Sequence, residues 1–155
     1  MNSFALTVIG SRYILLTGGR ASFESLSDQV CILDLDTGKW SSNLPTLSTA
    51  RCNHGSVATQ SKAFVFCGTG ANNKPLNSAE YLELSDKREW VPFELPGLKP
   101  RTCLVAALIN PSVVLLVGGL YIATCLSDGA YFDTETLEII YIRETNQLQF
   151  QCWNN

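Results

Sequence analysis

Short apolar runs separated by turn residues recur from one end of the sequence to the other. β-Branched and aromatic residues crowd these runs, and runs of this kind bounded by Gly, Pro, Asn, Asp and Ser are typical of β-strands. No stretch shows the apolar period of 3.6 residues that an amphipathic helix needs. The pattern predicts an all-β chain with strands near residues 4–9, 13–17, 30–35, 39–40, 56–59, 64–67, 79–84, 90–93, 104–109, 113–117, 130–132 and 139–142.

These predicted strands fall into three units of about 50 residues. The markers of the period are glycines, tryptophans and arginines at matching places. They are Gly18, Gly68 and Gly118, Trp40 and Trp90, and Arg51 and Arg101, with Ile140 in the third tryptophan's place. A fixed period in this range indicates a repeat architecture. We therefore expect repeat units at 1–50, 51–100 and 101–144, followed by a tail or closing strand at 145–155.

The units resemble the kelch repeat family, whose repeat is about 50 residues long. That family has two glycines after the second strand, a tyrosine on the third strand, a tryptophan on the fourth, and a linker containing Arg and His-Gly. The linker from Pro45 to Gly55, which contains Arg51 and His54, is the best match, whereas Pro100-Arg101 keeps only the arginine. The resemblance covers residues 3–143 and implies a kelch-type β-propeller with three four-stranded blades, a partial or half propeller.

Each unit matches the family motif incompletely. Cys31 stands where the first unit's tyrosine is expected, Thr69 replaces the second glycine of unit two, and Ile140 replaces the third tryptophan. The resemblance assigns structural roles to twelve residues: Gly18, Gly19, Trp40, Arg51, His54, Gly68, Tyr81, Trp90, Arg101, Gly118, Gly119 and Tyr131. The glycines would permit positive φ where a strand leaves its sheet, and both tryptophans would be buried between blades.

Three blades are too few to close a ring, since propellers usually have four to eight. The outer blades would then leave apolar faces in water, and large exposed apolar faces favour association. We expect a protein partner or self-association to complete the propeller. A fragment of a longer protein and a six-bladed ring made by two copies both remain open.

The third unit contains a long uncharged stretch. Residues 103–127 carry no charge, and residues 104–123 have the length of a transmembrane helix. Asn110-Pro111-Ser112 is a turn signal in the middle of this stretch. We therefore predict two buried strands joined by a turn and no membrane span.

Charge and cysteine spacing exclude several classes of partner. A net charge of −3 without a basic cluster argues against nucleic acid. Six cysteines at irregular spacing contain no Cys-x-x-Cys pair, so we expect reduced thiols, no metal and no cofactor. The first residues lack the basic and apolar regions of a signal peptide, which favours a cytoplasmic location.

Few residues suggest catalysis. His54 is the only histidine, and a dyad with Cys52 is conceivable, but the linker resemblance favours a structural role. Arg51 and Arg101 either form an anion-binding rim or, the favoured interpretation, hold loops through backbone carbonyls. Acidic residues such as Asp34 and Asp36 are most simply turn formers.

The loops that differ between units are the candidate binding surface. In kelch proteins the loop after the glycines and the arginine linker often line the binding end. The candidates for partner binding are Arg20, Phe23, Asn53, Asn72, Lys74 and Tyr121. The leading hypothesis is a non-catalytic protein–protein interaction module or scaffold. The alternative is part of a kelch-like propeller enzyme acting on a small organic substrate, although a single histidine disfavours a copper site of that type.

Overall fold

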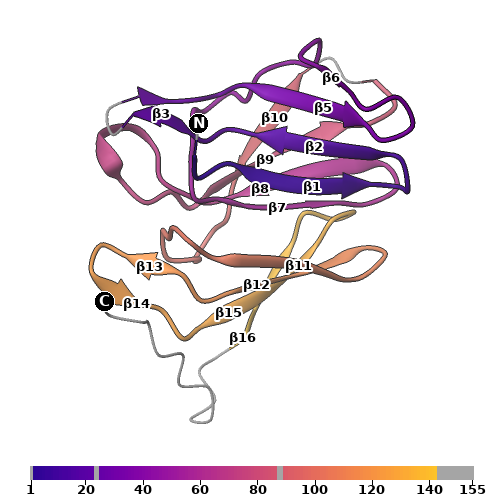
Figure 1. Ribbon diagram of the computed structural model, residues 1–155. Coiled ribbons are helices and arrows are strands. Elements are labelled where there is room, and N and C mark those ends of the chain that lie inside the picture. The colour runs from indigo at the N-terminus through magenta and orange to yellow at the C-terminus, as the bar shows by residue number, and fades with distance from the viewer. Residues whose placement is uncertain (1, 23–24, 87–88, 143–155) are drawn as a thin grey trace.

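A computed structural model describes residues 2–22, 25–86 and 89–142. The described chain is all-β apart from one 3₁₀ turn, η1 (Ala71–Asn73). Three four-stranded antiparallel sheets account for most of it (Figure 1). The expectation of an all-β chain organised as three four-stranded units is confirmed.

Each sheet uses consecutive segments of the chain. Sheet 1 contains β1 (Ala5–Ile9), β2 (Tyr13–Thr17), β5 (Val30–Asp34) and β6 (Lys39–Ser41), in that order. Sheet 2 contains β7 (Gly55–Ala58), β8 (Lys62–Phe66), β9 (Ser78–Glu83) and β10 (Trp90–Glu94). Sheet 3 contains β11 (Val105–Asn110), β12 (Val113–Val117), β15 (Gly129–Asp133) and β16 (Ile139–Ile142). The strands of each four-stranded sheet lie side by side in chain order, so every sheet is an up-and-down meander.

The uncharged stretch of the third unit forms two strands, as predicted. β11 and β12 pair antiparallel across the turn at Pro111 and Ser112. No helix among the described residues is long and apolar enough to cross a membrane.

The loops after the second strands contain structure that the sequence pattern did not predict. β3 (Arg20–Ser22) pairs with β4 (Ser25–Leu26), and β13 (Leu120–Tyr121) pairs with β14 (Thr124–Cys125). In the second unit η1 occupies the corresponding loop. All three loops emerge from the same end of the sheets (Figure 1), so the regions most different between units lie together.

The first strands of the three sheets lie next to one another. β7 contacts β1 on one side and β11 on the other, and Figure 1 shows it between them. The hydroxyls of Thr7 and Ser56 form a hydrogen bond between β1 and β7. Sheet 2 is therefore the middle sheet, and the two others flank it.

At three of the repeat markers, the residue that the structure places at the equivalent position is one residue away from the one assigned by the sequence alignment. Gly18, Cys67 and Gly118 each end a second strand with φ of 58°, 57° and 66°. Each also donates its N–H to a carbonyl at the start of the third strand: Gln29 and Asp128 directly precede β5 and β15, and Ser78 is the first residue of β9. The next residue is Gly19, Gly68 or Gly119, with φ of 103°, 95° and 101°. The glycine pair of unit two is thus Cys67-Gly68 rather than Gly68-Thr69.

The same shift moves two further markers. Leu15 pairs with Ile32, Phe64 with Tyr81 and Leu115 with Tyr131, so the first unit's tyrosine position is Ile32 and not Cys31. Trp40 pairs with Leu33, Trp90 with Leu82 and Ile139 with Phe132. The third residue at the tryptophan position is therefore Ile139, and the assignment of Ile140 to that position was wrong.

Candidate interaction surfaces

The middle sheet is covered on both faces. Side chains of a β-strand alternate between faces, and in β8 every residue from Ala63 to Phe66 is buried. In β2 and β12 only alternate residues are buried. Sheets 1 and 3 therefore have one covered face and one outward face each.

Sheets 1 and 2 pack through a cluster of aliphatic side chains and one tryptophan. Leu15 and Val30 of sheet 1 contact Val65, Leu82 and Trp90 of sheet 2. Trp90 is only 3% exposed. Its indole N–H donates to the carbonyl of Pro45, 3.1 Å away in the linker between the sheets. Trp90 is thus buried toward the preceding sheet, as expected of a tryptophan between blades.

Sheets 2 and 3 pack through a larger aromatic cluster. The ring of Phe132 lies 5.7 Å from Phe64 and 5.2 Å from Phe66, both edge to face, and 5.6 Å from Phe93 in a stacked arrangement. Edge-to-face and offset-stacked pairs add to the stabilisation that burial of each ring supplies. Ile139 and Tyr81 border this cluster.

The outward face of sheet 1 is apolar, and no strand of the described ranges covers it. We call it open face 1; it consists of Leu6, Val8, Ile14, Leu16, Leu33 and Trp40. Trp40 is 53% exposed. The expectation that Trp40 is buried is wrong. Side chains at the tryptophan position point toward the preceding sheet, and among the described residues no sheet precedes sheet 1.

The outward face of sheet 3 is its counterpart. We call it open face 3; it consists of Val105, Ala107, Val113, Leu115, Val117, Tyr131, Ile140 and Ile142. Ile140 is 67% exposed, and Tyr131 and Val105 are also exposed.

Both linker arginines are buried and hold their own sheets together. The Arg51 guanidinium donates to the carbonyls of Cys67 and Ser78 and to the Glu80 carboxylate, 2.8 Å away. Glu80 also accepts from the N–H groups of Ser48 and Thr49. Burial lowers the pKa of Arg51, and the neighbouring Glu80 charge opposes that effect. Neither charge reaches solvent, so the pair fastens the linker to sheet 2.

Arg101 repeats this arrangement with one difference. It donates to the Gly118 and Lys99 carbonyls and to both oxygens of Asp128, at 3.0 and 2.9 Å. The Asp128 side chain is 33% exposed, whereas Glu80 is fully buried. These contacts place both arginines inside the protein, where they cannot form a rim for an external anion.

His54 is likewise packed inside. Its Nε2 lies 2.8 Å from the hydroxyl of Thr17, its ring borders Gly18, and its Cβ borders Gly68. Burial, with a smaller contribution from the Arg51 charge, lowers the pKa of His54 to about 3. The hydrogen bond goes to Thr17, not to Cys52, so the geometry does not form the Cys–His dyad considered above.

Four of the cysteines in the described part of the chain are free thiols. Cys52 and Cys67 are buried, and Cys31 and Cys103, which are less buried, are also free. Burial raises the pKa of Cys67 to about 12. Cys125 is disulfide-bonded, so the expectation that all thiols are reduced is wrong at that position. Among the described residues, no three metal-ligating side chains come together.

The loop end brings several predicted binding residues together. Arg20 donates to the Asn73 side chain at 2.9 Å, which joins the loops of units one and two. The Lys99 ammonium lies 4.6 Å from the centre of the Tyr121 ring in unit three. A groove of about 600 Å³ lies between the 48–50 linker and the 70–73 loop, and Asn72 lines it. Phe23 lies outside the described residues.

Asn53 and Lys74 occupy different settings. Lys74 is exposed and follows η1. Asn53 has a positive φ of 52° and joins a backbone ladder between units. It donates its N–H to the Ser3 carbonyl and accepts from the Cys103 N–H. Its backbone therefore connects units.

Comparison with known proteins does not name a family. No protein-family model matches the sequence, and no curated protein matches it significantly. The similarity to kelch repeats therefore rests on the motifs of this chain.

Sequence reasoning missed the partners of the arginines and the extent of the open faces. Glu80 and Asp128 carried no repeat signal, because they stand at different positions in their units. Leu6 and Val8 had a usable signal, because they alternate with the buried Ala5 and Thr7 in an otherwise ordinary strand.

Proposed function

We propose that this chain is a non-catalytic protein–protein interaction module built from kelch-type β-propeller blades. The proposal rests on one observation: sheet 2 is covered on both faces, whereas open faces 1 and 3 expose apolar side chains such as Leu6, Trp40 and Ile140. Contiguous apolar surface of this kind marks interaction sites. The three repeated meanders and the glycine, tyrosine and tryptophan positions support the propeller and kelch parts of the proposal.

The loop end supplies a second surface for the same role. The loops that follow the second strands of the three units emerge from one end of the sheets (Figure 1), and they contain Arg20 in β3, Asn72 in η1, Lys74 after η1, and Tyr121 in β13. Loops on a rigid scaffold often carry recognition because their sequences vary without cost to the core. We place the choice of partner at this end and the completion of the propeller at the open faces.

Chemical cross-linking in cells, followed by mass spectrometry of the purified complexes, tests this function. We expect specific cross-links from Lys74 and Lys99 to partner proteins. Variants at the loop end, such as Lys74→Ala with Asn72→Ala, should lower the recovery of those partners. Asn43→Ala, an exposed loop change elsewhere, is the matched control. Absence of any specific cross-linked protein would contradict the proposal, and tightly held copper in the purified chain would favour the enzyme alternative.

A further inference from the structure

We propose that two copies of this chain join through their open faces, with open face 1 of each copy packed against open face 3 of the other. This inference rests on the proposed propeller arrangement and names its completing partner. Both internal interfaces follow one rule. In each interface, the face of one sheet that carries Leu15 or Phe64 packs against the face of the next sheet that carries Leu82 or Phe132. We call the first a following face, because it contacts the sheet that follows in the chain, and the second a preceding face, because it contacts the sheet that precedes.

The chain shows one unmatched face of each type. Leu33 and Trp40 on open face 1 hold the positions that Leu82 and Trp90 hold on sheet 2, so open face 1 is a preceding face. Leu115 and Tyr131 hold the positions of Phe64 and Tyr81, so open face 3 is a following face. A second copy supplies the missing partner for both, and a two-fold axis then closes the assembly with two identical joints.

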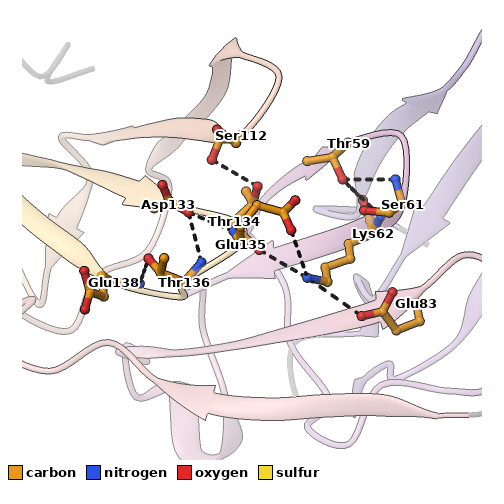
Figure 2. Close-up of polar contacts among 10 residues, drawn as sticks. All are labelled: Thr59, Ser61, Lys62, Glu83, Ser112, Asp133, Thr134, Glu135, Thr136 and Glu138. Atoms are coloured by element: carbon orange, nitrogen blue, oxygen red, sulfur yellow. Dashed lines mark hydrogen bonds and ion pairs between the residues drawn. The ribbon is translucent and has the colours of Figure 1, made fainter.

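One rim position shows complementarity specific to this chain. Between sheets 2 and 3, Lys62 of β8 reaches the turn between β15 and β16 (Figure 2). Its ammonium lies 3.4 Å from the Thr134 carbonyl and 3.9 Å from the Glu135 carboxylate. This internal contact is polar on both sides.

The equivalent pair across the proposed joint is apolar on both sides. Val113 holds the position of Lys62, since Val113 pairs with Asp133 and Lys62 with Glu83. Leu35 holds the position of Thr134, since each donates its N–H to the residue before the second strand, Arg12 or Ser112. Leu35 is 48% exposed. Val113 of one copy would therefore face Leu35 of the other, which replaces a polar contact by a matched apolar one.

The backbone ladder between units points the same way. Asn53 donates to the Ser3 carbonyl at 2.9 Å, and Cys103 donates to the Asn53 carbonyl at 2.8 Å. All three residues have φ between 52° and 57°. The ladder therefore has the Ser3 N–H at one end and the Cys103 carbonyl at the other. In the proposed assembly these two groups meet at each joint and continue the ladder.

Sedimentation of the full chain and of two single variants tests the pairing. Trp40→Asp changes open face 1 and Ile140→Asp changes open face 3, and both side chains are exposed, so folding should survive. We expect a wild-type dimer at micromolar concentration that does not grow at higher concentration. Because the dimer has two identical joints, each variant loses one hot-spot residue at both, so dimerisation should weaken by about 1,000-fold or more. Asn43→Asp places the same charge on an exposed loop and should have no effect. Circular dichroism checks the fold of each variant.

Mixing the two variants is the decisive measurement. In a mixed dimer, intact open face 3 of the Trp40→Asp chain meets intact open face 1 of the Ile140→Asp chain, so association should return through one joint. Failure of the mixture to associate, or an Ile140→Asp chain that dimerises normally, would overturn the pairing. Species that keep growing with concentration would overturn the closed dimer. A wild-type monomer would overturn the inference while cross-linked partners of other sequence kept the proposed function.

Discussion

The two sides of sheet 2 and the outward sides of sheets 1 and 3 are built from equivalent positions but have different surroundings. Trp90 is 3% exposed and Trp40 is 53% exposed, although both pair with a leucine on the neighbouring strand in the same way. Each strand position fixes the direction of a side chain, and the neighbouring sheet decides whether that side chain is buried. Trp40 therefore differs from Trp90 because nothing among the described residues stands before sheet 1.

The comparison extends to polar groups. Glu80 on the preceding face of sheet 2 binds Arg51 and the linker N–H groups of Ser48 and Thr49. The equivalent position on open face 1 is Cys31, whose thiol is free. A buried carboxylate stands where a linker crosses the face, and a small neutral side chain stands where none does.

Removal of the Glu80 carboxylate should have the largest effect. Glu80→Ala leaves the buried Arg51 charge without its counter-charge and the N–H groups of Ser48 and Thr49 without their acceptor, so we expect a loss of about 5 kcal/mol in the free energy of unfolding. Urea denaturation measures it. Cys31→Ala, the equivalent change on open face 1, should stay within about 0.5 kcal/mol. Similar losses at both positions would mean that the faces do not differ as described.

The next largest expected effect is the difference in stability loss between alanine substitutions of the two tryptophans. Trp90→Ala removes a side chain packed between two sheets and should cost about 3–5 kcal/mol. Trp40→Ala, measured by the same denaturation on monomeric protein, should cost under about 1 kcal/mol because the side chain already contacts water. A loss at Trp40 that matches the loss at Trp90 would show that open face 1 is covered in solution.

Low pH should act on the core between sheets through His54. Burial lowers the pKa of His54 from its ordinary value of 6.5 to about 3, so the unfolded chain takes up a proton more readily than the folded one. The stability from neutral His54 is complete above pH 6.5 and is lost as the pH falls toward 3. Between pH 6 and 4 we expect a loss of about 2 kcal/mol.

The repeat itself supplies the control for that measurement. Leu104 occupies the position of His54 in the next unit, one residue after the positive-φ residue Cys103. His54→Leu should therefore fold and should show a flatter dependence of the unfolding free energy on pH in the same range. An unchanged slope in this variant would assign the acid sensitivity to other groups.

The smallest expected effect concerns the glycines that end the second strands. Gly118→Ala should cost about 1–2 kcal/mol, from its positive φ alone, because an added Cβ would meet no atom closer than 3.6 Å. Gly18→Ala should cost more, since its Cβ would lie 2.3 Å from the Arg51 carbonyl. Thermal unfolding of both variants compares them. Equal losses of stability would mean that the linker around Arg51 shifts to accommodate the added Cβ of Gly18→Ala at no energetic cost.

Strand positions were predictable from sequence because alternation and turn residues are local signals. The register between the units was less predictable from the sequence. Gly68 was aligned with Gly18 by residue type, yet Cys67 adopts the φ of 57° that usually selects glycine. Spacing of the second strands is therefore 49 residues and then 51, while the arginines keep 50. The connections before and after the second strand therefore differ in length by one residue, while the spacing of the arginine linkers stays the same.

The interaction surfaces were only partly predictable. The sequence indicated that outer faces would be apolar, but the exposure of Trp40 required knowledge of which neighbour each face points to. Short pairs such as β3 with β4 were missed because two- or three-residue strands in polar loops carry no alternation. The buried role of Glu80 was hidden because a carboxylate on a strand does not indicate its partner when that partner lies 29 residues away.

The linker from Pro45 to His54 belongs to two sheets at once. Pro45 accepts from Trp90, Ser48 and Thr49 bind Glu80, and His54 bonds Thr17 of sheet 1. The boundaries of the sequence repeat therefore do not coincide with boundaries of independent folding. An engineer who wished to add, remove or transplant a unit would have to move this linker with the sheet that follows it. The exposed turn at Gln60 and Ser61, between β7 and β8, is a less disruptive site at which to cut or rejoin the chain than the junction at residue 50.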